Sequence, residues 1–79
     1  MAHELDLRGE PYPVDYVSAH LLLTQLMPGC RARLVFGDGD AVVDVSLLLQ
    51  GDGHEIVHVA RWGQNWVVDV CSGQRVHVT

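Results

Sequence analysis

The residues best suited to chemistry lie in the stretch 10–15, which reads Glu-Pro-Tyr-Pro-Val-Asp. Pro13 fits the first position of a helix, because the backbone N–H that proline lacks would have no partner there. Asp15 then falls in the first helical turn, where a carboxylate meets the positive end of the helix dipole. Tyr12 is therefore presented at a helix amino terminus beside a loop. A phenol with its ordinary pKa of about 10 is not a ready nucleophile at neutral pH. The favoured interpretation is an aromatic lid over the end of the sheet, with contact to a ligand or partner, or catalysis, as alternatives.

Two cysteines, Cys30 and Cys71, could carry sulfur or redox chemistry. They do not make a disulfide framework, and in a reducing compartment we expect free thiols. Cys71 ends a predicted strand beside a glycine turn, whereas Cys30 begins a strand at the end of the sheet opposite to Tyr12. Isolated cysteines mostly serve as packing residues. We therefore predict no catalytic residue and keep Cys71, followed by Cys30, as the alternative for sulfur or redox chemistry.

The histidines and the acidic turn do not form a predicted metal site. His54 and His58 are four residues apart on one strand, roughly 13 Å in extended chain. That separation is too large for one ion bound at about 2 Å. Asp38 and Asp40 lie in a glycine turn that lacks the later acidic ligand of a calcium loop and the lysine of a phosphate loop. The sequence predicts neither a metal nor a cofactor.

Hydrophobic periodicity and turn residues predict the elements that must position these side chains. They are a strand at 5–8, a helix at 14–27, a strand at 31–36, a helix at 40–50, strands at 55–62 and 66–71, and a possible short edge strand or tail at 72–79. The order strand, helix, strand predicts a right-handed crossover that makes the first two strands parallel. We expect Asp40 or Asp44 to cap the second helix.

The same patterns predict which side chains share a face. The first helix carries a broad apolar stripe of Val14, Val17, Leu21, Leu22, Leu23 and Leu26. The second helix carries a similar stripe, made of Val42, Val45, Leu48 and Leu49. In the third strand, one face carries Ile56, His58, Ala60 and Trp62, and the other carries Val57, Val59 and Arg61. With a loop at 63–65, Trp62 and Trp66 face each other as a cross-strand pair. If both point outward instead, they form an exposed partner site.

Composition limits the class of protein. Seventy-nine residues make one domain, and 48% hydrophobic with 19% charged residues is typical of a globular one. Five basic against ten acidic residues give a formal net charge of −5. That balance argues against nucleic acid and against an anionic membrane surface as partners. The longest apolar run is too short to span a membrane, and the first residues lack a signal-peptide pattern. We expect a single domain over 1–79, with its core at 4–71, in the cytoplasm.

Several short motifs, in order, resemble the TusA/SirA/YedF family of small sulfur-carrier proteins. Asp6-Leu7-Arg8-Gly9 is followed, after two residues, by Tyr-Pro-Val-Asp at 12–15. The family has Cys-Pro-x-Pro there. The further matches are Pro-Gly at 28–29, Gly-Asp at 37–38, Asp-Val-Ser at 44–46 and Gly-His-Glu at 53–55. The family's motif cysteine carries a persulfide, which the phenol of Tyr12 cannot form.

The resemblance and the order of elements predict a two-layer α/β sandwich, an α+β arrangement of the form β-α-β-α-β-β. Two helices cover one face of a four-stranded mixed sheet, similar to the C-terminal domain of translation initiation factor 3. The resemblance also implies a link to sulfur trafficking. Because the carrier cysteine is absent, the leading hypothesis is a non-catalytic binding or accessory module for a protein of sulfur or redox metabolism. A sulfurtransferase that uses Cys71 or Cys30, and a purely structural or weakly oligomerising domain, are the alternatives. The expected partner contacts are Arg8, Gly9, Glu10, Tyr12, Pro13 and Asp15.

Overall fold

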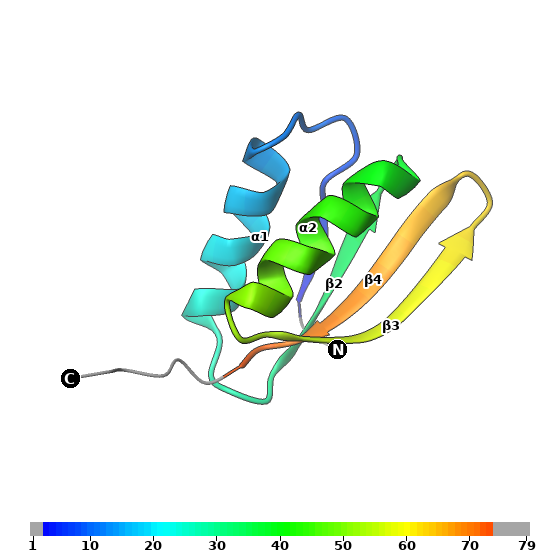
Figure 1. Ribbon diagram of the computed structural model, residues 1–79. Helices are drawn as coiled ribbons and strands as arrows, with labels where there is room; N and C mark the ends of the chain where they lie inside the picture. Colours follow the sequence, from blue (N-terminus) through cyan, green and yellow to red (C-terminus); the bar gives the residue numbers. More distant parts are fainter. Residues whose placement is uncertain (1–2, 74–79) are drawn as a thin grey trace.

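A four-stranded sheet carries two helices on one face in the computed structural model, which describes residues 3–73 (Figure 1). The elements in chain order are β1 (Glu4–Asp6), α1 (Val14–Gln25), β2 (Arg31–Phe36), α2 (Gly39–Gly51), β3 (Glu55–Trp62) and β4 (Asn65–Cys71). β1 pairs parallel with β2, and β4 pairs antiparallel with both β2 and β3, which gives the order β1-β2-β4-β3. The predicted mixed-sheet sandwich is thus confirmed. The predicted edge strand or tail lies largely outside the described residues.

The core fills the space between the helices and one face of the sheet. In β2, Ala32, Leu34 and Phe36 are buried, because every second residue of a strand points to the same face. The buried apolar residues that meet them come from the other elements and are Leu7, Ala19, Leu23, Val42, Val45, Leu49, Val68 and Val70. Each large apolar side chain buried in this way contributes about 1.5–3 kcal/mol.

Helix α1 buries only part of the predicted apolar stripe: Leu23 is in the core and Leu22 and Leu26 pack against it. Ala19 and Leu23 are fully buried, whereas Val14, Val17 and Leu21 remain 45%, 46% and 54% exposed. Apolar residues occur around most of this helix, so the hydrophobic periodicity alone could not define its buried face.

Among residues 3–73, no helix has the length and apolar character needed to cross a membrane.

Helix α1 begins at Val14 as predicted, but the capping residues differ from the predicted ones. Pro13 occupies the N-cap position of α1, directly before the first helical residue. Asp38 caps α2, and its side chain accepts a hydrogen bond from the backbone N–H of Asp40 at 2.9 Å. The prediction of Asp40 or Asp44 as the cap is therefore wrong. Asp38 has the extended backbone of a capping residue, while Asp40 already belongs to the first turn.

The hairpin between β3 and β4 turns through residues 63–64 and not through three residues as predicted. Trp62 pairs with Asn65, and Arg61 pairs with Trp66. The two tryptophans consequently lie on opposite faces of the sheet, and the predicted cross-strand pair is wrong. A change of one residue in register moves a side chain to the other face, because the strand period is two.

Strand β3 contains an irregularity between Ile56 and His58. Ile56 pairs with Val70 and Val59 pairs with Val68, so both point to the helix side of the sheet. The predicted grouping of Ile56 with His58 is wrong, since the extra residue shifts the alternation. β3 lies at the edge of the sheet, where bulges hinder pairing with a further strand.

Candidate functional site

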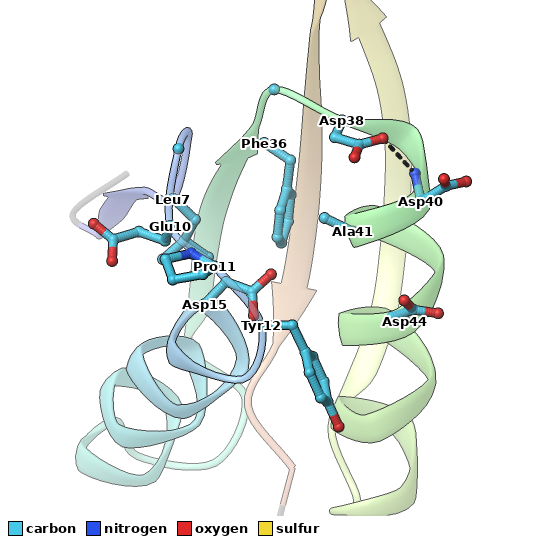
Figure 2. Close-up of a pocket in the computed structure, with 12 residues that line it drawn as sticks. Leu7, Glu10, Pro11, Tyr12, Asp15, Phe36, Asp38, Asp40, Ala41 and Asp44 are labelled. Carbon is cyan, nitrogen blue, oxygen red and sulfur yellow. Dashed lines mark hydrogen bonds between the residues drawn. The ribbon is translucent and has the colours of Figure 1, made fainter.

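A cavity of about 460 Å³ lies where the carboxyl ends of β1 and β2 meet the amino ends of α1 and α2 (Figure 2). In sheets with parallel strands, ligands usually bind beyond this edge. The apolar part of the lining comprises Leu7, Pro11, Phe36 and Ala41. The segments that form it come from both halves of the β1-α1-β2-α2 unit, so the crossover itself creates the cavity.

The loop after β1 brings Tyr12 to the mouth of the cavity. The backbone N–H of Leu7 donates to the carbonyl of Val35 at 2.8 Å, which holds the loop start against β2. Gly9 then turns the chain with φ of 80°, a conformation that other residues disfavour. The side chain of Tyr12 is 65% exposed, and its ring lies beside α2 (Figure 2).

Asp15 is the buried charged group of the site, with only 2% of its surface exposed. Its carboxylate points into the space between the two helices (Figure 2). Oδ1 accepts a hydrogen bond from the backbone N–H of Tyr16 at 2.7 Å. Oδ2 accepts no hydrogen bond from any of the described residues. One side of this carboxylate thus faces the cavity.

The other charged groups that line the cavity are also carboxylates: Glu10, Asp38, Asp40 and Asp44. Within the described part of the chain, no lysine or arginine lines it. The positive ends of both helix dipoles are therefore met by the protein's own negative charges. This arrangement favours a cation over a phosphate or a thiolate.

Arg8, the base nearest to the cavity along the chain, is held by another carboxylate. Its Nε and Nη2 donate to the two carboxylate oxygens of Asp6 at 2.9 and 2.7 Å. The side-chain hydrogen bonds from Arg8 lower the pKa of Asp6 to about 2. They also raise the pKa of Arg8 above its ordinary value. Neither Arg8 nor Asp6 lines the cavity.

Four of the six predicted contact residues line the cavity: Gly9, Glu10, Tyr12 and Asp15. Arg8 pairs with Asp6 instead, and Pro13 serves as the helix cap. In Figure 2, the side chain of Glu10 points away from α2, so it contributes at the rim. The contribution of β2 and α2 was not predicted, because only the tertiary fold brings those segments to the β1–α1 loop.

Both cysteines lie at the other end of the sheet. Cys71 pairs with Arg31, the first residue of β2, whereas the cavity adjoins Phe36, the last. The carbonyl of Cys30 accepts a hydrogen bond from the backbone N–H of Ser72 at 2.7 Å. Both cysteines are partly buried free thiols. A sulfur carrier based on either cysteine would thus use a site remote from Tyr12.

A second polar cluster joins α1 to the end of α2, and sequence reasoning missed it. Asp52 Oδ2 accepts a hydrogen bond from the hydroxyl of Tyr16 and lies 3.0 Å from His20 Nδ1. This hydrogen bond to Asp52 is the largest cause that raises the pKa of Tyr16. The spacing of four residues between Tyr16 and His20, whose ring centroids are 5.7 Å apart, was the available signal.

The ring of His54 meets that of His20 edge-on, with 6.4 Å between centroids, and its Nδ1 accepts a hydrogen bond from the backbone N–H of Gly73. Over residues 3–73, no group of three or more histidine, cysteine or acidic side chains is arranged to hold a metal ion.

Comparisons with known proteins give the family. No model of a protein family matches the chain. A protein of Archaeoglobus fulgidus, named as a candidate sulfur carrier protein, is 32% identical over 60 residues, which cover 76% of this chain and 68% of that protein.

Two solved structures share the fold. The SirA-like protein of Desulfitobacterium hafniense has a TM-score of 0.76 at 15% identity, and a Helicobacter pylori protein has a TM-score of 0.66 at 23% identity. Each match covers 90% of this chain and 97% of the other. The extent and identity of the Archaeoglobus match, together with the shared fold, lead to one conclusion. The chain belongs to the TusA/SirA-like family of sulfur carrier proteins.

Proposed function

We propose that this chain is a binding or accessory module of sulfur trafficking that docks a protein partner at the Tyr12 end of α1. The observation that carries the proposal is Tyr12 itself. This exposed phenol stands where the resemblance to the family places the sulfur-carrying cysteine. A phenol cannot form a persulfide. The carboxylate of Asp15 beside it would also disfavour a thiolate, because like charges raise the pKa of an acid.

The surface around Tyr12 supports a contact with protein. A second, shallower hollow of about 320 Å³ adjoins the cavity and is lined by Tyr12, Asp44, Leu47 and Leu48. Tyr12 and Leu47 are 65% and 64% exposed. Exposed aromatic and aliphatic side chains that lie together are typical of interaction sites. We infer a partner from sulfur or redox metabolism, met in the cytoplasm.

Sulfur loading tests the non-catalytic part of the proposal. We expect that incubation with a cysteine desulfurase and cysteine, followed by intact mass measurement, adds no sulfur atom to the chain. The same experiment on Cys71→Ser and Cys30→Ser identifies the alternative. A gain of one sulfur that disappears in either variant would replace the accessory module with a carrier that uses that cysteine.

Partner binding tests the docking site. We expect Tyr12→Ala to weaken binding of a sulfur-donating partner, such as the desulfurase, by about tenfold or more, since buried aromatic anchors dominate interfaces. Trp62→Ala is the matched control, because Trp62 is a similarly exposed aromatic, at 57%, on the sheet face without helices. Calorimetric titration measures both. Equal affinities for wild type and Tyr12→Ala would place docking elsewhere, and self-association in sedimentation without partner binding would favour the oligomerising domain.

A further inference from the structure

We propose that the cavity beside Tyr12 receives a positively charged side chain, an arginine or a lysine, that the protein partner supplies. The inference rests on the proposed function, since it assigns the chemistry of the partner at the same site. It goes beyond that proposal because it names the group that enters the cavity and the carboxylate that binds it.

Asp15 is the primary reason. Asp15 is 2% exposed as a residue, and a carboxylate so placed gains from hydrogen-bond donors, because desolvation of a charge is costly. Among the described residues, the only donor to Asp15 is the adjacent backbone N–H of Tyr16. Asp15 lines the cavity, so a guanidinium or ammonium N–H that enters it can donate a further hydrogen bond to the carboxylate. Hydrogen bonds to charged groups of this kind are the strong ones in proteins.

The apolar part of the lining indicates what kind of side chain carries the charge. Leu7, Pro11, Phe36 and Ala41 lie around the approach to Asp15 (Figure 2). A bare metal cation or a small hydrated ion gains nothing from such a surface. The side chains of arginine and lysine bury an aliphatic stem along apolar surface while the charged end reaches a polar partner. A volume of about 460 Å³ is ample for one such side chain.

The rim adds attraction without a competing cation. Asp38, Asp40 and Asp44 lie at the α2 side of the cavity, and Arg8 is already paired with Asp6. The exposed ring of Tyr12 at the mouth offers a π face to a cation that passes it. Charge complementarity of this kind mainly sets partner choice and the rate of association.

Titration of the ¹⁵N-labelled protein with short peptides, followed by NMR, tests the inference. The probes are acetylated and amidated Gly-Arg-Gly, Gly-Lys-Gly and Gly-citrulline-Gly. Citrulline has nearly the shape of arginine without its charge. We expect the arginine or the lysine peptide to shift the amides of Asp15, Ala41 and their neighbours. The citrulline peptide should bind about tenfold more weakly or not at all, since charged hydrogen bonds exceed neutral ones.

Asp15→Asn and Glu55→Gln form a matched pair of variants. Each removes one negative charge, but Glu55 is exposed on the edge strand β3, away from the cavity. We expect Asp15→Asn to weaken binding of the arginine peptide by about tenfold or more, and Glu55→Gln to leave it within about twofold. If Asp15→Asn does not fold, Asp40→Asn with Asp44→Asn is the substitute, and their combined effect should be a weakening of a few-fold.

Three results would overturn the inference. They are equal affinity for the arginine and citrulline peptides, equal effects of Asp15→Asn and Glu55→Gln, and binding of free agmatine but of none of the peptides. The last result would assign the cavity to a small amine. These results are distinguishable from failure of the proposed function. A partner whose affinity depends on Tyr12 but not on Asp15 would leave the docking site in place and would remove only the requirement for a positively charged side chain on the partner.

Discussion

At the scale of single residues, Asp15 differs from an ordinary carboxylate in a first helical turn. Such a group normally faces water and gains about 0.3–1 kcal/mol from the helix dipole. Asp15 is buried and keeps one oxygen toward a cavity. Because both residues line this cavity, we expect the negative charge of Asp15 to influence a group placed at residue 12.

Restoring a thiol at residue 12 tests that influence. We expect Tyr12→Cys with Asp15→Asn to have a lower thiol pKa than Tyr12→Cys alone, because the double variant removes a neighbouring negative charge. The difference should be below about one pKa unit, given the size of first-turn charge effects. Thiolate absorbance against pH measures it. The same pKa in both variants would mean that Asp15 does not act on residue 12.

The hydrogen bond from Tyr16 to Asp52 predicts a response to alkaline pH. It raises the pKa of Tyr16 in the folded protein. Its stabilising contribution is therefore fully present below about pH 10, the unfolded value, and is lost as the pH rises through the higher folded pKa. We expect the phenolate absorbance of Tyr16, isolated in Tyr12→Phe, to appear at lower pH when Asp52→Asn is added. Asp40→Asn is the control. A shift of equal size in that control would contradict the local cause.

At the scale of elements, the capping of α2 provides a sharp test of where this helix begins. Asp38→Ala should lower the free energy of unfolding by about 1 kcal/mol, since it removes the acceptor for the Asp40 N–H. Asp44→Ala removes the same charge from an exposed position in the same helix and should cost less. Denaturant unfolding measures both. A larger loss from Asp44→Ala would restore the prediction made from the sequence.

The choice of buried face on α1 is testable in the same way. Leu23→Ala should cost about 2–5 kcal/mol, because Leu23 is fully buried. Leu21→Ala should change stability by no more than about 0.5 kcal/mol, because Leu21 is 54% exposed. Leu22 and Leu26, which are only partly buried against the core, should fall between. Equal losses from Leu21→Ala and Leu23→Ala would support the broader apolar stripe.

The elements that were predictable are those whose signal is local. The bounds of β2 and the turn-rich boundaries follow from period and glycine, and the parallel pairing of β1 with β2 follows from the crossover rule. The register of the hairpin could not be predicted in this way, because a two-residue turn and a three-residue turn both fit the residues near 63–65. The cap at Asp38 was missed among neighbouring acidic residues that a capping rule alone cannot rank.

At the scale of the whole molecule, the two ends of the sheet differ in chemistry. The end at Phe36 carries the carboxylates and Tyr12, and the end at Arg31 carries Cys71. Tyr12 and Asp15 could be predicted as a site because they are neighbours in sequence. Phe36 and Ala41 could not, because only the packing of α2 against β2 places them beneath that loop.

The hairpin that separates Trp62 from Trp66 also provides two optical reporters in one small molecule. Trp62, which is 57% exposed, has the guanidinium of Arg33 5.1 Å from its ring on the open sheet face. Trp66 is partly buried on the helix side, with Arg61 over its ring. In Trp62→Phe, the remaining fluorescence should be blue-shifted and poorly quenched by iodide, and in Trp66→Phe it should be red-shifted and readily quenched. Similar spectra in the two variants would contradict the register. With the register described here, emission from Trp66 reports loosening of the helix layer, and emission from Trp62 reports a molecule that approaches the open face of the sheet.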